Sequence, residues 1–341
     1  MKTPIASLSL DLDNKWTYLK VRGDPSWEKL PSYLDLVTPR ILKLFDDLDV
    51  RATVFVVGQD AVLETNREAI SAIAAAGHEI ANHSFHHEPW LHRYSERELE
   101  DEVIRAEEAI AQLTGQHPRG FRGPGFSRSD ALVHILARRG YLYDASTLPT
   151  FLGPVARAYY FLRSNLDDKQ RKQRQGLFGQ LRDGFLPLDA YWCELSAGGL
   201  VEIPVTTMPI TRLPIHFSYL AYLSQFSQRL ASHYWQTALS LCSLTGVAPS
   251  LLLHPLDLMG EDDDAAMRFF PGMNVPLAKK QDLVMNVLTQ FTKSYNVQPL
   301  IEHARHVRAC LGMVAEPLAC GDRELREVPE FAGSIPATRH S

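Results

Sequence analysis

The chain has 341 residues, of which 45% are hydrophobic and 22% are charged, an ordinary balance for a globular protein that buries a substantial core. A formal net charge of -5 and a pI near 6.2 exclude a strongly basic protein, so the overall charge does not point to nucleic acid as a partner. The four cysteines, Cys193, Cys242, Cys310 and Cys320, form no C-x-x-C pair, which favours a reducing compartment.

The first segment, IASLSLDLD at residues 5–13, is rich in Leu and Ile and ends in carboxylates, so it predicts a first strand. The acidic residues Asp11 and Asp13 arrive before an apolar secretory region could be completed. No apolar run is long enough to span a membrane. We therefore expect a cytoplasmic protein, and contact with the inner face of the membrane stays open.

Strand-like and helix-like segments then alternate along the chain. The strand-like segments are short and rich in β-branched or apolar residues, whereas the helix-like segments carry apolar residues every three or four positions. The expected strands are 52–58, 78–82, 119–127 (running into a Gly/Pro loop), 141–146, 200–205, 248–257 and 295–300. The expected helices are 31–49, 64–76, 95–113, 129–140, 218–244, 276–291 and 302–311. Such succession predicts a parallel sheet, open or closed into a barrel.

The alternation breaks from about residue 148 to 199, where the sequence is basic, Gln-rich and dotted with Phe and Leu. We interpret this stretch as a helical insertion in a single domain that covers residues 1–312. The tail, residues 313–341, is rich in Pro, Glu and Arg without an apolar period, so we expect it to be loosely ordered.

Ionisable side chains follow several of the expected strands at their carboxyl ends. In parallel α/β folds these ends face one common crevice, which is where functional groups gather. Singly, a strand-end Asp is usually a cap and a lone His is usually structural. Two imidazoles four residues apart and a carboxylate from another strand, however, can make a three-ligand metal site. The residues are Asp11, Asp13, His83, His87, Arg122, Asp144 and His254.

The order of these residues, D-x-D, H-S-x-x-H, R-x-P, a strand-end Asp and then L-x-H, resembles the polysaccharide deacetylases, the NodB-homology or carbohydrate esterase family four. The resemblance runs from about residue 5 to about residue 310, without the insertion and the tail. It implies an α/β fold, a distorted (β/α)7 barrel. It also implies a divalent metal, most often zinc, that serves to hydrolyse N-acyl groups on sugars; cobalt, nickel or iron could occupy the same ligand set.

The resemblance also implies residue roles. Asp13, His83 and His87 would bind the metal, which leaves His86 and Glu88 outside the ligand set. Asp11 would be the general base, because the metal polarises the amide carbonyl and lowers the pKa of water, whose proton a carboxylate can accept.

Three more residues of the motifs would complete the chemistry. His254 would protonate the leaving amine as general acid, a role that suits histidine near neutral pH. Arg122 would orient Asp11 and keep it ionised, and Asp144 would pair with His254 and favour its imidazolium form.

Substrate contacts are expected from three further positions. The backbone N–H of Gly125 would donate to the tetrahedral oxyanion. Trp16 and Trp90 follow the two metal motifs, and either could wall a sugar pocket or only pack in the core.

The first motif departs from the usual T-F-D-D-G, because here it is S-L-D-L-D. This D-x-D form resembles the branch that holds the lipid-linked aminoarabinose deformylase and the allantoinase-like members. We expect an N-acylated amino sugar as substrate, lipid- or nucleotide-linked, and the sequence does not separate acetyl from formyl.

Other interpretations stay open. The basic, aromatic insertion could rest on anionic lipid headgroups, or be a solvated lid or a subunit contact. The chain could be an allantoinase-like hydrolase of cyclic amides. It could also be a non-catalytic carbohydrate-binding protein on the same scaffold, although the expected base, ligands and acid are all present.

Overall fold

The computed structural model describes residues 3–163, 166, 168–174, 176–177, 179–195 and 198–313. The expected tail therefore lies outside the described residues except for Met313. The strands are β1 (Ile5–Asp11), β2 (Thr53–Val56), β3 (Glu79–Asn82), β4 (Gly120–Phe121), β5 (Tyr143–Asp144), β6 (Tyr191–Leu195), β7 (Gly198–Glu202), β8 (Ser250–Leu253) and β9 (Asn296–Gln298). The α-helices are α1 (Lys15–Arg22), α2 (Leu34–Asp47), α3 (Gly58–Ala61), α4 (Arg67–Ala75), α5 (Glu96–Thr114), α6 (Asp130–Arg138), α7 (Gly153–Arg163), α8 (Asp168–Gln173), α9 (Phe217–Ser224), α10 (Gln228–Thr245), α11 (Leu277–Ser294) and α12 (Leu300–Cys310).

Parallel strands form one curled sheet in the order β7-β5-β4-β3-β2-β1-β8, seven strands within the described part of the chain. β6 pairs antiparallel with β7 at the edge, and β9 pairs with the first residues of β1. The chain beyond β7 bends toward β8, since the Thr206 N–H donates to the Ser250 carbonyl at 3.0 Å. The expected α/β fold of the (β/α)7 type is thereby confirmed, as a sheet curled into a half-barrel.

β1 lies between β2 and β8 and explains how the fold presents polar groups inside. Successive side chains of a strand point to opposite faces. Leu8 and Leu10 pack in the hydrophobic core that also holds Ile41 of α2. Ser9 and Asp11 point the other way, where both accept hydrogen bonds from Arg122. A strand whose apolar and polar residues alternate therefore places a row of polar side chains inside the barrel.

The helices pack around the sheet as their apolar spacing predicts. Ser95 and Glu98 form the expected capping box at the start of α5, and the apolar stripe Leu99, Val103 and Ile110 is buried. α3 approaches α5 so closely that a Cβ at Gly58 would lie 2.7 Å from the Cα of Ala106, which only glycine avoids.

Three segments differ from expectation. Residues 191–195, inside the stretch expected to be helical, form the edge strand β6. The expected helix 218–244 is two helices, α9 and α10, because α9 ends at Ser224 and Ser227 caps α10 through its side chain. α1 was not predicted; Asn14 begins it by accepting a hydrogen bond from the Lys15 N–H.

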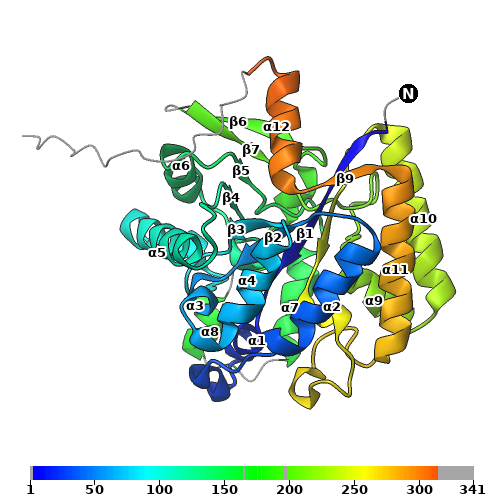
Figure 1. Ribbon diagram of the computed structural model, residues 1–341, viewed down its shortest axis with the longest axis horizontal. Coiled ribbons are helices and arrows are strands. Elements are labelled where there is room, and N and C mark those ends of the chain that lie inside the picture. The colour runs from blue at the N-terminus through cyan, green and yellow to red at the C-terminus, as the bar shows by residue number, and fades with distance from the viewer. Residues whose placement is uncertain are drawn as a thin grey trace, which may run out of the picture.

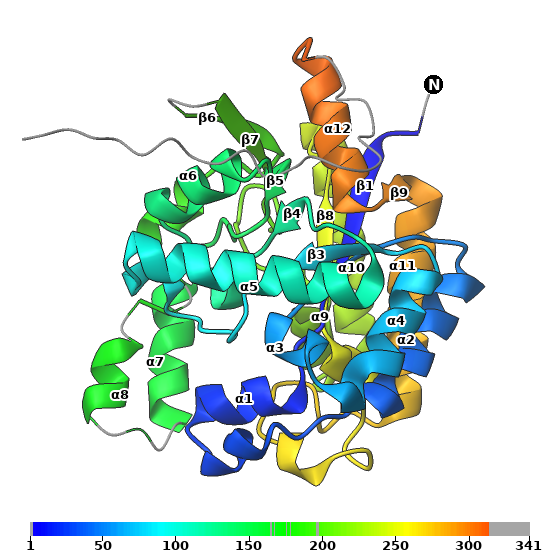
Figure 2. The same ribbon diagram turned by 60° about the vertical axis from the view of Figure 1, so that its left-hand side comes forward.

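The two ends of the barrel carry different elements (Figures 1 and 2). β1 runs toward the end where α1, α7 and α8 lie, so the carboxyl ends of the strands face these helices. α12 covers the opposite end, beside the start of β1. The helices of the insertion therefore lie on the same side of the molecule as the predicted site.

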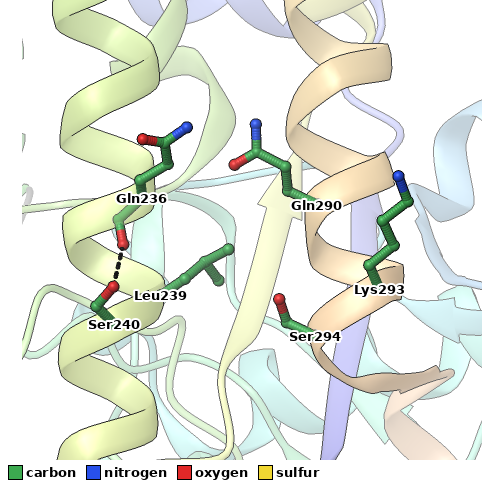
Figure 3. Close-up of a pocket in the computed structure, with 6 residues that line it drawn as sticks. All are labelled: Gln236, Leu239, Ser240, Gln290, Lys293 and Ser294. Carbon is green, nitrogen blue, oxygen red and sulfur yellow. Dashed lines mark hydrogen bonds between the residues drawn. The ribbon is translucent and has the colours of Figure 1, made fainter.

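Two cavities lie away from those carboxyl ends. One of about 330 Å³ separates α10 and α11 and is lined by Gln236, Leu239, Ser240, Gln290, Lys293 and Ser294 (Figure 3). Another, of about 460 Å³, lies near the start of β1 and includes Cys242 and His303 in its lining.

In the described part of the chain, every helix is too short or too polar to cross a bilayer.

Candidate metal centre

Asp13, His83 and His87 lie together at the carboxyl ends of β1 and β3. Asp13 Oδ1 is 2.9 Å from His87 Nε2 and 3.3 Å from His83 Nε2. All three side chains are buried, and within the described residues they are the group of ligand-type side chains whose donor atoms lie within 4.8 Å of one another. The sequence-predicted ligand set is thus brought together.

Hydrogen bonding fixes which nitrogen of His83 faces this cluster. Its Nδ1 lies 2.7 Å from the Arg122 carbonyl oxygen, which can only accept, so Nδ1 carries the proton. Nε2 is then the nitrogen that faces Asp13. This arrangement, a ligand-type imidazole fixed through its other nitrogen, is usual for histidines that bind metals.

The loop between the two histidines has an uncommon backbone. Ser84 and His87 have φ of 61° and 52°, in the left-handed region that non-glycine residues seldom adopt. Glu102 of α5 holds the loop, because its Oε2 accepts the backbone N–H groups of Phe85 and His86 at 3.0 Å each. Glu102 was missed by the sequence analysis, since an acid in a helical stripe carries no signal for a loop packed against it.

His86 and Glu88 have other partners. The His86 ring hydrogen-bonds to Glu102, away from Asp13. Glu88 pairs with Lys20 of α1 at 2.6 Å. The prediction that neither belongs to the ligand group agrees with these contacts.

Asp11 and Arg122 form a buried ion pair next to the cluster. Arg122 Nη1 donates to Asp11 Oδ1 at 2.6 Å and to Ser9 Oγ at 3.0 Å, and its Nε donates to the Ala145 carbonyl at 2.9 Å. Asp11 Oδ2 lies 4.0 Å from His83 Nε2. One oxygen of Asp11 is therefore engaged by Arg122, while the other faces the metal-ligand group.

His254 follows β8, as expected, but its acidic partner is different. Its Nδ1 lies 3.1 Å from Ser218 Oγ and 3.9 Å from Asp257 Oδ2. Asp257 also accepts the His254 backbone N–H at 2.8 Å. Asp257 is three residues away in the H-P-L-D turn, a capping spacing that could have revealed it.

The predicted pairing of Asp144 with His254 is wrong. The Asp144 carboxylate accepts from Ser146 and lies 3.4 Å from Arg128 Nε, which is also 3.3 Å from Glu202. Burial raises the pKa of both acids, and the pKa of Glu202 is raised further by Asp144. Asp144 lies on β5 and Glu202 on β7, neighbouring strands, so the two buried acids share one half-buried arginine, Arg128.

Asp144 contacts the loop after β4 through Ser146. Ser146 Oγ donates to Asp144 and accepts the Gly123 N–H at 2.8 Å. Gly125 follows with φ of 58°, at an exposed turn beside Pro89. Gly125, the position expected to supply an oxyanion donor, therefore lies in a turn. The start of this turn, Gly123, is hydrogen-bonded to Ser146 just after β5.

The two tryptophans differ in surroundings. Trp16 is fully buried; its indole N–H donates to Asp60 at 2.9 Å, and its ring meets the His87 ring edge-on. Trp90 is also buried and lies under Arg174 of the insertion, whose guanidinium carbon is 5.2 Å from the ring centre. Trp16 packs behind the site rather than lining an open pocket.

The electrostatics of the cluster favour a carboxylate beside two imidazoles. Burial by itself raises the pKa of Asp13, but His87 and His83 outweigh it and hold that pKa well below its usual value. Burial lowers the pKa of His83, and the charges of Asp11 and Asp13 more than offset this, so the pKa of His83 is raised. Two imidazoles and one carboxylate form a donor set that suits zinc and similar divalent ions.

Comparison with known proteins gives related sequences over part of the chain. The polysaccharide deacetylase family model matches residues 26–143. A peptidoglycan deacetylase from Helicobacter pylori is 34% identical over 110 residues, 32% of this chain and 36% of that protein. A chitooligosaccharide deacetylase from Bradyrhizobium is 39% identical over 98 residues, 28% of this chain and 43% of that protein. These matches thus span well under half the length of the curated relatives.

Solved structures extend the likeness over nearly the whole chain at the level of the fold. A candidate polysaccharide deacetylase from Mycobacterium smegmatis superposes with a TM-score of 0.60 at 22% identity, covering 94% of this chain and 96% of that chain. The PuuE allantoinase gives a TM-score of 0.52 at 18% identity, covering 90% and 91%.

Proposed function

Because the chain belongs to the polysaccharide deacetylase family, matched over residues 26–143, we propose that it is a metal-dependent hydrolase that removes an N-acyl group, acetyl or formyl, from an amino sugar. The observation that carries this proposal is the convergence of Asp13, His83 and His87 beside the Asp11–Arg122 pair. A non-catalytic binding protein would have no need for this combination.

Asp13, His83 and His87 fit a divalent ion. Both imidazoles present Nε2 toward the carboxylate, and the three side chains leave further positions of a tetrahedral or octahedral ion for solvent and substrate. When bound, such an ion supplies Lewis-acid polarisation of the amide carbonyl and of water.

Asp11 is the general base in this proposal. Arg122 holds one of its oxygens, and the oxygen that faces His83 can accept a proton from the attacking water. The hydrogen bond from Arg122 also fixes the orientation of the Asp11 carboxylate.

His254 is the proposed general acid. Ser218 and Asp257 occupy its Nδ1 side, which leaves Nε2 to give a proton to the leaving amine. The carboxylate of Asp257 stabilises the imidazolium that must form before this step.

Metal content and product release test the proposal together. Purified protein loaded with zinc is assayed for acetate or formate release from N-acyl glucosamine oligomers and from lipid- and nucleotide-linked N-acyl amino sugars, with allantoin as the alternative substrate. We expect release from a sugar, its loss in Asp11→Asn with zinc retained, and loss of zinc in His83→Ala. His86→Ala is the matched control and should retain zinc.

Full activity of Asp11→Asn would overturn the base assignment. Hydrolysis of allantoin without any sugar would replace the amino-sugar proposal by the cyclic amide alternative. Stoichiometric zinc with no hydrolysis, while the sugars still bind, would favour the non-catalytic alternative.

We also propose that the insertion contacts anionic lipid, so that a lipid-linked sugar can reach the site. The support is an apolar exposed row on α7, Val155 and Leu162, beside the exposed cations Arg171 and Lys172 of α8. The insertion is fixed next to α1, since Tyr160 donates to the Val21 carbonyl at 2.5 Å and Arg174 to the Lys20 carbonyl at 3.1 Å.

Vesicle co-sedimentation tests this contact. We expect binding to vesicles with phosphatidylglycerol, weaker binding to neutral vesicles, and loss of binding in Leu162→Ser. Leu244→Ser is the control, because Leu244 of α10 is 82% exposed and Leu162 is 84% exposed. Equal sedimentation of wild type and Leu162→Ser, or a concentration-dependent dimer that Leu162→Ser dissolves, would contradict the lipid proposal.

A further inference from the structure

Asp60 is a buried acid that the proposed reaction does not use. It lies on α3, directly after β2, and is only 1% exposed. Its Oδ1 accepts three hydrogen bonds, from Asn14 Nδ2 at 2.8 Å, Trp16 Nε1 at 2.9 Å and Asn66 Nδ2 at 2.8 Å. A carboxylate oxygen that accepts three hydrogen bonds holds the three donor groups in fixed positions.

Two of the three donors belong to the segment that carries Asp13. Asn14 is the next residue, and its own Oδ1 caps α1 through Lys15 N–H and accepts the Tyr33 N–H at 3.2 Å. Asp60 therefore fixes the Asn14 amide, and through it the turn between β1 and α1. The backbone carbonyl of Asp13 is held on its other side by the Tyr33 hydroxyl at 2.5 Å.

Trp16, the other donor in that segment, contacts His87 of the second ligand motif. The Trp16 ring lies edge-on to the His87 ring, with ring centres 6.4 Å apart. His87 also has the uncommon φ of 52°, so its ring position depends on what packs against it. Because Asp60 fixes the indole N–H of Trp16, it limits where the His87 ring can lie.

Asp60 also has an unsatisfied atom. Its Oδ2 is buried without a hydrogen-bond partner. Burial raises the pKa of this carboxyl to about 7 in spite of its donors. A buried oxygen without a hydrogen-bond partner lowers the stability of the fold. We therefore expect Asp60 to have a role that offsets this loss of stability.

We propose that Asp60 is a positioning residue of the metal centre, which holds Asp13 through Asn14 and His87 through Trp16. This inference rests on the proposed function, since it takes Asp13 and His87 as metal ligands. Asp60 does not touch the metal or the substrate. Its removal should therefore weaken metal binding without removing a ligand.

Zinc affinity, measured by competition with a chromophoric chelator, tests the role of Asp60 without reference to activity. Asp60→Leu keeps a side chain of similar size and removes the acceptor of all three donors. We expect its zinc Kd to rise about 10- to 100-fold, the usual effect of changing a group that orients metal ligands. Glu79→Leu is the matched control, since Glu79 is a partly buried acid with donors from Thr53, Tyr143 and Ile301, but belongs to the opposite end of the barrel.

Trp16→Phe is a second variant that keeps an aromatic ring but removes the N–H donor together with one ring of the indole. We expect an intermediate rise in Kd, so the test remains valid if Asp60→Leu folds poorly. Unchanged zinc affinity in folded Asp60→Leu or in Trp16→Phe, with zinc bound by wild type, would overturn the positioning role and leave the proposed function intact. An equal rise in Kd for Glu79→Leu would also overturn it, because the effect would then reflect general destabilisation. Absence of zinc binding by wild type would instead refute the metal centre itself.

Discussion

Arg122 and Asp11 meet inside the barrel, where Arg122 Nη1 donates to Asp11 Oδ1 at 2.6 Å and both side chains are buried. Arg122 also lies over the Phe55 ring, with its guanidinium carbon 4.2 Å from the ring centre. The pair links β4 to β1 across the interior of the sheet, since Arg122 directly follows β4 and Asp11 ends β1. It is therefore a structural contact as well as part of the proposed reaction.

Arg122→Gln is expected to lower the free energy of unfolding by about 3–5 kcal/mol, because removal of one partner leaves Asp11 buried and uncompensated. Urea denaturation of the metal-free protein measures this loss. Arg138→Gln is the control: Arg138 pairs with Glu96 at 2.9 Å on the surface, and such a pair contributes at most about 1 kcal/mol. Equal losses in the two variants would contradict the structural role of Arg122.

Glu102→Ala is expected to weaken zinc binding and to speed amide hydrogen exchange at Phe85 and His86, since both N–H groups lose their acceptor. Isothermal titration with zinc and exchange followed by mass spectrometry are the measurements. Glu108→Ala, an exposed change on the same helix, should alter neither quantity. Exchange that stays slow in Glu102→Ala would mean that other contacts fix the loop.

Asp257→Asn is expected to lower kcat while KM changes little. The reason is that the Asp257 carboxylate accepts the His254 backbone N–H at 2.8 Å and lies 3.9 Å from His254 Nδ1, so it orients the proposed general acid. Asp144→Asn is the comparison, since Asp144 contacts Arg128 and Ser146. A loss of kcat in Asp144→Asn but not in Asp257→Asn would restore the original pairing.

His303 is expected to make stability depend on pH. Burial lowers its pKa to about 4, and His306 adds to this, while its Nδ1 lies 3.0 Å from Ser7 Oγ. The unfolded chain binds a proton near pH 6.5, so stability should be fully present above that pH and fall by about 3 kcal/mol as pH drops toward 4. Urea denaturation from pH 7 to pH 4 measures this slope. His303→Gln should remove this part of the slope and leave the part that comes from His78 and His216, whose pKa values burial also lowers, to about 4 and about 3. An unchanged slope in that variant would assign the effect to those other groups.

The parts of the site that could be predicted from sequence are those whose partners are fixed by strand register. Parallel strands bring their carboxyl ends together, which predicted that the strand-end Asp, His and Arg residues meet, and the resemblance to the deacetylase motifs singled out Asp13, His83 and His87 among them as metal ligands. The buried row Ser9 and Asp11 follows from simple alternation along β1.

The acids that support the site could not be predicted in this way. Glu102 and Asp60 lie on helices, and each binds N–H groups of a segment that tertiary packing alone brings near. The wrong partner for His254 has a similar cause, since a strand-end Asp on β5 and a turn Asp after β8 are equivalent in sequence and only the curl of the sheet separates them. β6 was missed because its five residues lie in a segment of otherwise helical composition.

The place of β1 between β2, β8 and β9 has a consequence for the order of folding. Asp13, His83 and His87 all belong to the first third of the chain, but β1 pairs with Ser250–Leu253 and Asn296–Gln298, more than 240 residues later. During synthesis one edge of the ligand-bearing strand stays unpaired until β8 has left the ribosome. The long separation of these pairings should make acquisition of the native sheet slow, with the metal ligands exposed to solvent for most of translation.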